Sequence, residues 1–407
     1  MNIQIEFKNN ELKGKVNLPA SKSISNRVLI IHALSGNEKA VENVSDCEDT
    51  RRMLEVLGSA SDRFDVGHAG TAMRFLTAFL ARRPGVWEIT GSERMKQRPV
   101  KILAEALNRL GARIEYAEQE GFPPLRIYGS VLKGGELEIS GAVSSQYISA
   151  LLMIAPSMEK GLTLRLKDKT VSRTYIEMTV GIMREFGALV EIEESLIRVK
   201  PGGYVPVPYR VEADWSGASY FYELLALAAE GELVLEGLKE KSLQGDARQQ
   251  DVWDRLGITT RFEGEKVILR KKACGISRLD WDFIEMPDLV QSFAVACCLK
   301  GIPFVFSGVE TLRIKETDRI SALIEELGKL GFRVKAGENH RLIWEGERCA
   351  VRSTEIATYQ DHRMAMAFAP AALVYPGLLI QDQEVVRKSF PFYWEELGKL
   401  GARIKIE

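Results

Sequence analysis

The chain has 407 residues, which is more than one hydrophobic core normally organises and enough for two domains. Its hydrophobic content of 45% and charged content of 27% are typical of a globular protein that folds in water. With 55 basic and 56 acidic residues, the formal net charge of −1 argues against a nucleic-acid partner, so any cationic site must be local. No apolar run reaches the length of a membrane span, and no signal-peptide core lies at the start of the sequence, so we expect no membrane partner.

The cysteines and histidines indicate neither a disulfide framework nor a metal site. The five cysteines include no C-x-x-C pair, and the four histidines are scattered without metal-ligand spacing. We therefore expect reduced thiols, a cytoplasmic location and no bound metal.

The segment from Leu18 to Arg27 predicts the first helix and the first candidate site. Apolar residues follow it at helical spacing, and Ser21 is placed to cap the helix, with Lys22 in its first turn. The unpaired N–H groups and the dipole of a helix start attract anions, and Arg27 lies one turn along the same face. An ordinary capped surface helix is the alternative. A Ser/Lys hydrolase is a weaker one, because no G-x-S-x-G motif accompanies the pair.

A helix that ends in Leu-Gly or Phe-Gly and precedes a strand recurs six times, which indicates internal duplication. The glycines are expected to be left-handed helix caps. They stand at Gly58, Gly111, Gly187, Gly257, Gly331 and Gly401. The first interval is 53 residues and the others are 70 to 76, so about one hairpin is expected to be missing between Gly58 and His68.

Each copy is preceded by another helical segment, so each unit reads strand–helix–strand–helix–strand–strand. The preceding helices are expected to begin near Ser21, Gly70, Ser144, Asp214, Asp288 and Asp361. Six units divide into two domains of three. The extended, proline-rich segment 204–209 marks the boundary. We predict residues 1–20 plus 212–407 as one domain, with the first residues adding a strand to it, and 21–211 as the other. The chain would cross near 19–21 and 210–213, and this double hinge suggests closure over a ligand.

Cationic residues gather at the predicted helix starts. Together they suit two multiply charged anionic substrates. They are Lys22, Arg27, Arg98, Lys315, Arg319, Arg363 and Lys388. Taken singly, Asp288 could be a helix N-cap, and the cluster from Lys315 to Arg319 could be a solvated helix face. No G-x-x-x-x-G-K-[ST] motif supports a P-loop nucleotide enzyme.

Seven ordered motifs carry a resemblance to a known family. They are LPASKSISNR, HAGTAMR, RMKQRP, SSQ, IKETDR, DHRMAM and RKSFPFYW. From residue 14 to the C-terminus the chain resembles the 5-enolpyruvylshikimate-3-phosphate synthase family. The resemblance implies an α/β (α+β) fold of two domains, with three βαβαββ units in each. It implies transfer of the enolpyruvyl group of phosphoenolpyruvate to the 5-hydroxyl of shikimate 3-phosphate, with no metal or organic cofactor, and recognition of the inhibitor glyphosate beside Gly70. We expect small anionic substrates as partners and a monomer.

The resemblance also implies the site residues. Those expected to hold shikimate 3-phosphate are Lys22, Ser23, Arg27, Ser144, Ser145, Gln146, Ser172, Tyr175, Asp288, Thr311 and Lys315. Those expected to hold phosphoenolpyruvate are Lys22, Gly70, Arg98, Gln146, Glu316, Arg319, Arg363 and Lys388. Asp288 would accept the proton of the hydroxyl, Glu316 would give a proton to the methylene carbon and later remove one, and Lys22 completes the catalytic set.

Three positions depart from the family pattern. His68 replaces the usual Asn before A-G-T-A-M-R, Phe75 replaces the Pro after it, and Thr311 aligns with an Asn that contacts substrate. The shortened stretch after Gly58 should remove peripheral strand structure and no ligand group.

Three alternatives stay open. A UDP-N-acetylglucosamine enolpyruvyl transferase shares the fold but uses a loop cysteine, and the segment 87–99 has none. An RNA 3′-terminal phosphate cyclase would need a nucleotide and a nucleophilic His. A catalytically inactive module that binds anions is a third, against which the intact Asp288, Glu316 and Lys22 argue.

Overall fold

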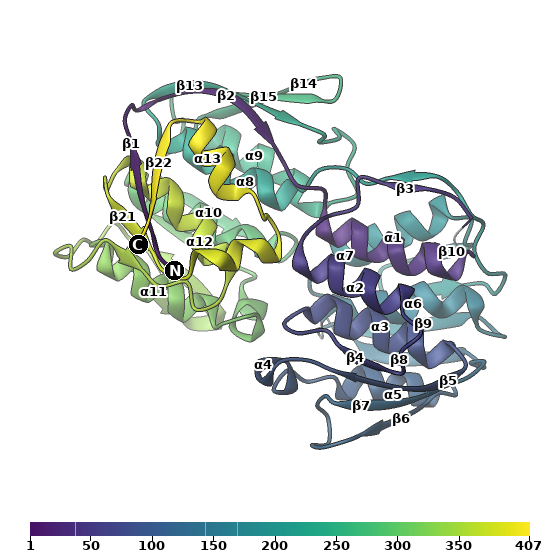
Figure 1. Ribbon diagram of the computed structural model, residues 1–407. Helices are drawn as coiled ribbons and strands as arrows, with labels where there is room; N and C mark the ends of the chain where they lie inside the picture. Colours follow the sequence, from purple (N-terminus) through teal and green to yellow (C-terminus); the bar gives the residue numbers. More distant parts are fainter. Residues whose placement is uncertain (37, 143, 169) are drawn as a thin grey trace. The chain divides into compact units, whose positions relative to one another are not determined.

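The computed structural model describes residues 1–36, 38–142, 144–168 and 170–407. The chain forms two compact units (Figure 1). Unit 1 comprises Met1–Pro19 and Glu212–Glu407, and unit 2 comprises Ala20–Val211. Within the described residues, the strands form five four-stranded sheets and one two-stranded ladder.

All five large sheets have the same topology, which is the structural form of the sequence repeat. In each sheet two strands pair in parallel, and two further strands are added antiparallel. Three of the sheets are built from consecutive segments, with a helix between the parallel strands and a hairpin at the other edge. The middle sheet of unit 1, with the order β16-β17-β19-β18, is one example. In the other two sheets, the N-terminal strands β1 and β2 take the place of a consecutive strand. Two parallel strands need a crossover connection between them, and each repeat supplies a helix for this connection. The resemblance to a fold of βαβαββ units is thereby confirmed.

The elements of unit 1 begin with two strands from the N-terminus and continue after residue 212. The strands are β1 (Ile3–Phe7), β2 (Glu11–Asn17), β13 (Glu230–Glu236), β14 (Ile258–Glu263), β15 (Lys266–Lys271), β16 (Leu279–Asp282), β17 (Phe304–Ser307), β18 (Lys335–Gly337), β19 (Arg341–Trp344), β20 (Glu355–Ile356), β21 (Leu378–Ile380) and β22 (Ala402–Ile406). The α-helices are α8 (Trp215–Leu227), α9 (Gln249–Arg255), α10 (Val290–Lys300), α11 (Arg319–Lys329), α12 (His362–Phe368) and α13 (Tyr393–Lys399).

Unit 2 is continuous in sequence. Its strands are β3 (Val41–Glu42), β4 (Arg63–Asp65), β5 (Gly85–Thr90), β6 (Arg113–Tyr116), β7 (Leu125–Gly129), β8 (Gly135–Ser140), β9 (Leu162–Lys167), β10 (Val190–Ile192), β11 (Leu196–Val199) and β12 (Tyr209–Arg210). Its α-helices are α1 (Lys22–Leu34), α2 (Glu48–Gly58), α3 (Gly70–Arg82), α4 (Glu93–Lys96), α5 (Lys101–Arg109), α6 (Ser145–Ile154) and α7 (Arg173–Glu185).

The first repeat is reduced, as its short interval predicts. Among its described residues, the strands are the two residues of β3 and the two of β12, which pair in parallel. Between α2 and α3 lies only β4, which is the opening strand of the next repeat, so the hairpin is missing. The N-terminus contributes two strands to unit 1 where one was expected. Strand β1 pairs with β21 and β22 and completes the last repeat, while β2 opens another beside β13 (Figure 1).

The glycines that close the repeated helices behave alike in five copies out of six. Gly111, Gly187, Gly257, Gly331 and Gly401 have φ between 81° and 106°, the left-handed conformation that glycine adopts without penalty. The prediction is wrong for the glycine at 58, which is the last residue of α2 and is followed by an extended residue. With no hairpin to enter, the chain leaves this helix without the left-handed turn.

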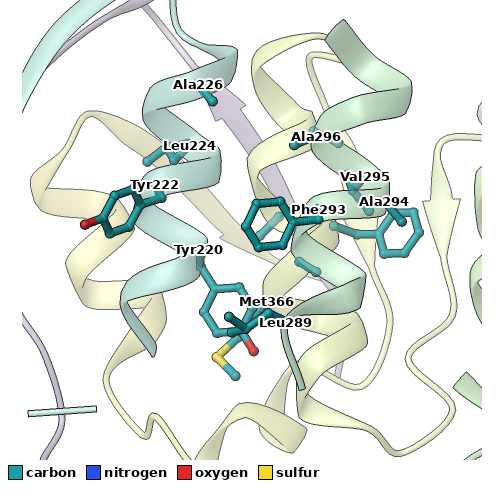
Figure 2. Packing of buried hydrophobic residues seen from close by; sticks show 14 of the residues in the cluster. Tyr220, Tyr222, Leu224, Ala226, Leu289, Phe293, Ala294, Val295, Ala296 and Met366 are labelled. Carbon is teal, nitrogen blue, oxygen red and sulfur yellow. The ribbon is translucent and has the colours of Figure 1, made fainter. Parts of the chain in front are cut away.

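The core of unit 1 lies around α8 and α10. All residues of α8 from Trp215 to Ala226 are buried, and the helix is apolar on nearly every side, as expected of a helix enclosed by others. Figure 2 shows α8, which carries Tyr220 and Tyr222, beside α10, which carries Phe293, with Met366 next to the ring of Tyr220. The rings of Trp253 and Phe293 stack with centroids 4.2 Å apart. This rigid pair of helices supports the loops that carry the acidic and basic residues of unit 1.

None of the helices in the described part of the chain is long and apolar enough to span a membrane.

Candidate active site

The N-terminus of α1 is built as the sequence predicts. The Oγ of Ser21 accepts the N–H of Ile24 at 3.4 Å, so this buried residue is the N-cap. Lys22 and Ser23 occupy the first turn. The ammonium of Lys22 lies 3.4 Å from the carboxylate of Asp49, which belongs to the first turn of α2. A partly buried lysine at a helix start is therefore held in place by one carboxylate, and both the dipole and the ammonium can attract an anion.

Arg27 is directed into unit 2, and its side chain is only 2% exposed. Its guanidinium donates to the Oγ1 of Thr179 at 2.7 Å, to the Oγ of Ser149 and to the carbonyls of Ser23 and Tyr175. Burial lowers the pKa of Arg27 to about 10. These uncharged acceptors fix the side chain, so Arg27 joins α1, α6 and α7. A direct contact with a substrate stays a prediction.

Phe75 is part of the same arrangement. It is fully buried on α3, and the guanidinium of Arg27 lies 5.2 Å from the centre of its ring. The helix still begins at Gly70, so this departure from the family pattern leaves the helix start in place. His68 is exposed, and its Nδ1 lies 3.0 Å from the Oγ of Ser92.

Gly70 and Arg98 are in direct contact. A Cβ added at Gly70 would lie 2.9 Å from the Cζ of Arg98, closer than carbon atoms approach without rearrangement. Arg74, one turn along α3, is buried and donates to the carbonyls of Gly70 and Pro99. It thereby ties the loop that carries Arg98 to the start of α3. The motif H-A-G-T-A-M-R contains Arg74, but sequence reasoning assigned it no role.

The starts of α6 and α7 place the remaining predicted residues of unit 2. Ser144 is the N-cap of α6, and Gln146 donates to the Oγ1 of Thr71 on α3 at 3.2 Å. Ser145 is buried in the first turn. Ser172 caps α7 with φ of 53°, an uncommon conformation for serine that turns the chain sharply into the helix. Tyr175, half-buried, follows in its first turn.

In unit 1 the predicted residues converge on one guanidinium. Arg319 begins α11 and is 1% exposed. Its Nε donates to Asp361 at 2.7 Å, its Nη1 to Asp288 at 2.8 Å and its Nη2 to Glu316 at 3.0 Å. The acidic partners raise the pKa of Arg319 further against the opposing effect of burial, so the side chain is permanently charged. Three carboxylates on one arginine make this a densely charged cluster.

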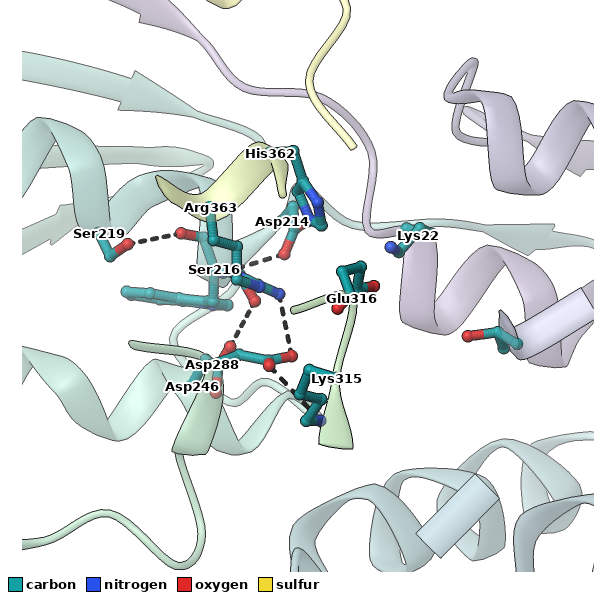
Figure 3. A network of polar contacts seen from close by, with 12 residues as sticks. Lys22, Asp214, Ser216, Ser219, Asp246, Asp288, Lys315, Glu316, His362 and Arg363 are labelled. Carbon is teal, nitrogen blue, oxygen red and sulfur yellow. Dashed lines mark hydrogen bonds and ion pairs between the residues drawn. The ribbon is translucent and has the colours of Figure 1, made fainter. Parts of the chain in front are cut away.

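Asp288 lies at the centre of this cluster (Figure 3). Arg363 donates to its second oxygen at 2.9 Å, and the ammonium of Lys315 lies 3.7 Å away. Burial disfavours the charged carboxylate, but Arg363, Lys315 and Arg319 outweigh it and hold the pKa of Asp288 well below its usual range. The carboxylate caps no helix, because Asp288 lies in the single 3₁₀ turn Pro287–Leu289 before α10. The alternative of an N-cap is thereby excluded.

Glu316 links the cluster to the C-terminal region. One of its oxygens accepts from Lys388 at 2.8 Å and the other from Arg319. Thr311, which aligns with the family's Asn, lies in the 3₁₀ segment Glu310–Ile314 that leads to Lys315. Its Oγ1 is buried and has no hydrogen-bond partner in the described structure, and its contact with a substrate stays a prediction.

Two acidic residues of the cluster, Asp361 and Asp246, were not expected from the sequence to be site residues. Asp246 belongs to the 3₁₀ segment Gly245–Arg248, is 4% exposed and accepts a hydrogen bond from Ser216 of α8. Burial raises its pKa to about 7, and the negative charge of Asp288 adds to this effect. The segment Q-G-D-A-R looks like an ordinary loop, so no local signal marks Asp246. Its importance comes from neighbours that are distant in sequence.

The predicted residues therefore form two groups, one in each unit. Unit 1 brings together Asp288, Lys315, Glu316, Arg319, Arg363 and Lys388, with Thr311 nearby in the chain. Unit 2 places Lys22, Ser23, Gly70, Arg98, Ser144, Ser145, Gln146, Ser172 and Tyr175 at or near the starts of α1, α3, α6 and α7, and turns Arg27 inward. Among the described residues, no three His, Cys, Asp or Glu side chains are arranged to hold a metal ion.

Comparisons with known proteins agree on one family. A sequence model of EPSP synthase (3-phosphoshikimate 1-carboxyvinyltransferase) matches residues 7–61 and 58–397. A protein of Bacteroides fragilis named 3-phosphoshikimate 1-carboxyvinyltransferase is 50% identical over 398 residues, which cover 97% of each chain. A protein of the same name from Photobacterium damsela subsp. piscicida is 36% identical over 420 residues, covering 96% of this chain and 97% of that one.

A solved structure supports the fold. The structure of EPSP synthase from Acinetobacter baumannii superposes with a TM-score of 0.78 at 23% identity and covers 100% of both chains. At this identity the likeness shows the fold alone.

Proposed function

The chain belongs to the EPSP synthase family, and from that premise we propose that it transfers the enolpyruvyl group of phosphoenolpyruvate to the 5-hydroxyl of shikimate 3-phosphate and releases phosphate. The observation that carries the proposal is the cluster around Arg319, where three carboxylates and four cations meet. A transfer between two anions needs cations to bind them and carboxyl groups to move protons. The cluster supplies both.

We assign shikimate 3-phosphate mainly to helix starts. The helix starts offer hydroxyl, amide and ammonium donors beside unpaired backbone N–H groups. The residues that carry these donors are Lys22, Ser23, Ser144, Ser145, Gln146 and Ser172. Tyr175 would face the ring, and Arg27 would act by holding α1, α6 and α7. From unit 1, Asp288, Lys315 and Thr311 complete the assignment, and the unpartnered Oγ1 of Thr311 supports its place there.

We assign phosphoenolpyruvate to arginines and lysines. In unit 1 this set consists of Arg319, Arg363, Lys388 and Glu316. In unit 2 it consists of Lys22, Arg98, Gly70 and Gln146. Guanidinium groups match phosphate and carboxylate groups with paired donors. Gly70 lets the guanidinium of Arg98 lie against the backbone at the start of α3, because a side chain at this position would meet Arg98.

The carboxylates also explain how proton transfer begins. Arg319, Arg363 and Lys388 contact Asp288 and Glu316 directly. An anionic substrate competes for those donors, and a carboxylate that shares its cations accepts a proton more readily. Asp288 then takes the proton of the 5-hydroxyl as its oxygen bonds to C2 of phosphoenolpyruvate, while protonated Glu316 gives a proton to C3. In the second half the bond from C2 to the phosphate oxygen breaks, and Glu316 takes back a proton from C3. The departing phosphate carries away the proton that Asp288 accepted.

Several finer statements accompany this proposal. We propose that the two units are the two domains, with the chain crossing near 19–21 and 210–213, and that the protein is a cytoplasmic monomer that binds no nucleic acid. The five free cysteines support a reducing compartment, and the balanced charge of the chain supports small-molecule partners. Glyphosate is expected to compete with phosphoenolpyruvate.

Phosphate release tests the proposed function. We expect phosphate from phosphoenolpyruvate with shikimate 3-phosphate and none above background with UDP-N-acetylglucosamine. Release with the UDP-sugar alone would favour the sister transferase, and release with neither acceptor would favour an inactive module that binds anions.

A further inference from the structure

The chain that leads to Asp361 and Arg363 is held in an uncommon conformation. Tyr359 and Gln360 have φ of 54° and 56°, two successive non-glycine residues in the left-handed region. Such residues cost free energy and persist only where surrounding contacts impose them. The N–H of Asp361 closes the turn on the carbonyl of Thr358 at 2.9 Å. Contacts from outside the turn 358–361 must therefore stabilise its conformation.

Helix α11 provides that contact. Arg319 and Glu326 are seven residues apart, about two helical turns, so they lie on the same face of the helix. Arg319 binds Asp361 at 2.7 Å. Glu326 binds the other end of the segment, because it accepts the O–H of Tyr359 at 2.6 Å and the N–H of Ala357 at 3.2 Å. The segment 357–361 is thus fastened along α11 at two points.

The carboxylate of Glu326 is costly to bury and is fully satisfied. Its side chain is 0% exposed, and Lys329 donates to its oxygens at 2.9 and 2.8 Å. The position five residues before the glycine is apolar and buried in four of the six repeats. Those residues are Met53, Ala106, Ile182 and Val252. At a position where the other repeats place an apolar core side chain, a carboxylate indicates that Glu326 is needed for its hydrogen bonds and not only for packing.

The near-identical helix α13 shows which part of this arrangement is specific. Glu396 occupies the same repeat position, is 1% exposed, pairs with Lys399 and accepts the N–H of Asn17 at 3.0 Å. Both glutamates therefore bind the backbone at or just after the end of a strand. Only Glu326 also binds a tyrosine hydroxyl within a left-handed pair of residues.

We propose that Glu326 is a positioning residue that acts through Tyr359 and the N–H of Ala357 to fix the turn 358–361 and thereby the orientation of Asp361, Arg319 and Arg363. Asp361 accepts from the guanidinium of Arg319 and, at 2.9 Å, from the backbone N–H of Arg363, so it orients the side chain of Arg319 and fixes the backbone that carries Arg363. The assignment of these arginines to phosphoenolpyruvate rests on the proposed function. The positioning of the arginines does not.

Tyr359→Phe tests the proposal with little risk to folding, because the ring of Tyr359 is 38% exposed and only its hydroxyl is removed. We expect the KM for phosphoenolpyruvate to rise about fivefold to tenfold while the KM for shikimate 3-phosphate changes less than about twofold. Tyr375→Phe is the matched control. It removes a hydroxyl that donates to the carbonyl of Leu330 beyond the far end of α11, at 2.8 Å, and should leave both KM values unchanged.

Glu326→Gln, compared with Glu396→Gln, separates positioning from stability. An amide presents one acceptor and one NH₂ group, so it cannot accept from both Tyr359 and Ala357, and the hydrogen bond of one of them must be reversed or lost. Both variants should unfold at a lower temperature, but only Glu326→Gln should raise the KM for phosphoenolpyruvate. Equal increases in the two variants would overturn the proposal, as would unchanged KM values in Tyr359→Phe and Glu326→Gln.

A measurement independent of turnover keeps the inference apart from the proposed function. The Nε–H of Arg319 donates to Asp361, and its exchange with solvent can be followed by NMR in the full chain. We expect exchange to accelerate about tenfold or more in Tyr359→Phe and to stay unchanged in Tyr375→Phe. Unchanged exchange in Tyr359→Phe contradicts the positioning role even if the wild type turns over. Accelerated exchange supports it even if the wild type does not.

Discussion

The two units handle positive charge in different ways. In unit 1, Arg319, Arg363, Lys315 and Lys388 all lie against carboxylates of Asp288, Glu316 or Asp361. In unit 2, Arg27 meets hydroxyls and carbonyls, and Arg98 lies against the backbone of Gly70. The ammonium of Lys22 lies near the carboxylate of Asp49.

The difference teaches what each group of residues can do. An anion that binds the cluster of unit 1 must compete with carboxylates of the protein, so binding there is coupled to proton transfer. An anion that binds the helix starts of unit 2 meets dipoles, hydroxyls and few opposing charges, so binding there mainly positions the ligand. We therefore expect substitutions in unit 1 to change chemistry and those in unit 2 to change binding or folding.

The largest effect is expected from Asp288→Asn. Turnover should fall by roughly two or more orders of magnitude because the hydroxyl loses its base. The affinity for phosphoenolpyruvate should stay the same or increase, because Arg319 and Arg363 lose a competing carboxylate. Steady-state kinetics and calorimetric titration measure the two quantities. Near-normal turnover would remove Asp288 from the catalytic role.

Arg27→Met should lower the free energy of unfolding by about 2–3 kcal/mol, because Thr179, Ser149 and two carbonyls lose a buried donor. Arg98→Met, at a half-buried position, should leave stability nearly unchanged and weaken phosphoenolpyruvate binding. Urea denaturation with kinetics on the folded variants distinguishes the two arginines. Wild-type stability of Arg27→Met would show that the structural role assigned to Arg27 is wrong.

Gly70→Ala sharpens the comparison within unit 2. The new methyl group would displace Arg98, and overpacking of about 1–3 kcal/mol corresponds to a KM for phosphoenolpyruvate raised about fivefold to 150-fold. Glyphosate, the longer molecule, should lose more affinity than the substrate. Inhibition at varied phosphoenolpyruvate concentrations measures both effects. Equal glyphosate affinity in wild type and variant would show that the open space at Gly70 does not matter.

Asp246→Asn should change how stability depends on pH. Because the pKa of Asp246 is raised to about 7 in the folded chain, the folded state binds more protons than the unfolded state between about pH 4 and 7. Its contribution to stability is fully present below pH 4 and is lost as the pH rises through 7. In wild type the slope from this group should be on the order of 1 kcal/mol per pH unit, and in Asp246→Asn it should disappear. Equal slopes in denaturation series from pH 5 to 7 would exclude this titration.

The sequence by itself determined the repeat, the shortened first unit and most helix starts. Ser21 caps its helix as expected, and the helices expected to begin near Ser144, Asp214 and Asp361 start there, with these residues as their N-caps. Capping and helical spacing are local, so the residues near a helix start contain the information needed to predict it. Ordered motifs also gave the family, since several short segments in a fixed order rarely coincide by chance.

Only the tertiary structure decided how side chains from distant segments meet. It turned Arg27 inward, placed Asp288 among three cations and brought Asp246 next to them. It also distinguished Glu326 from Glu396, although the two stand in identical stretches of seven residues. Burial and charge partners depend on residues far away in the chain, and they set both pKa values and orientation. The same local sequence therefore fixes a strand end in one repeat and, in the other, also the turn that carries Asp361 and Arg363.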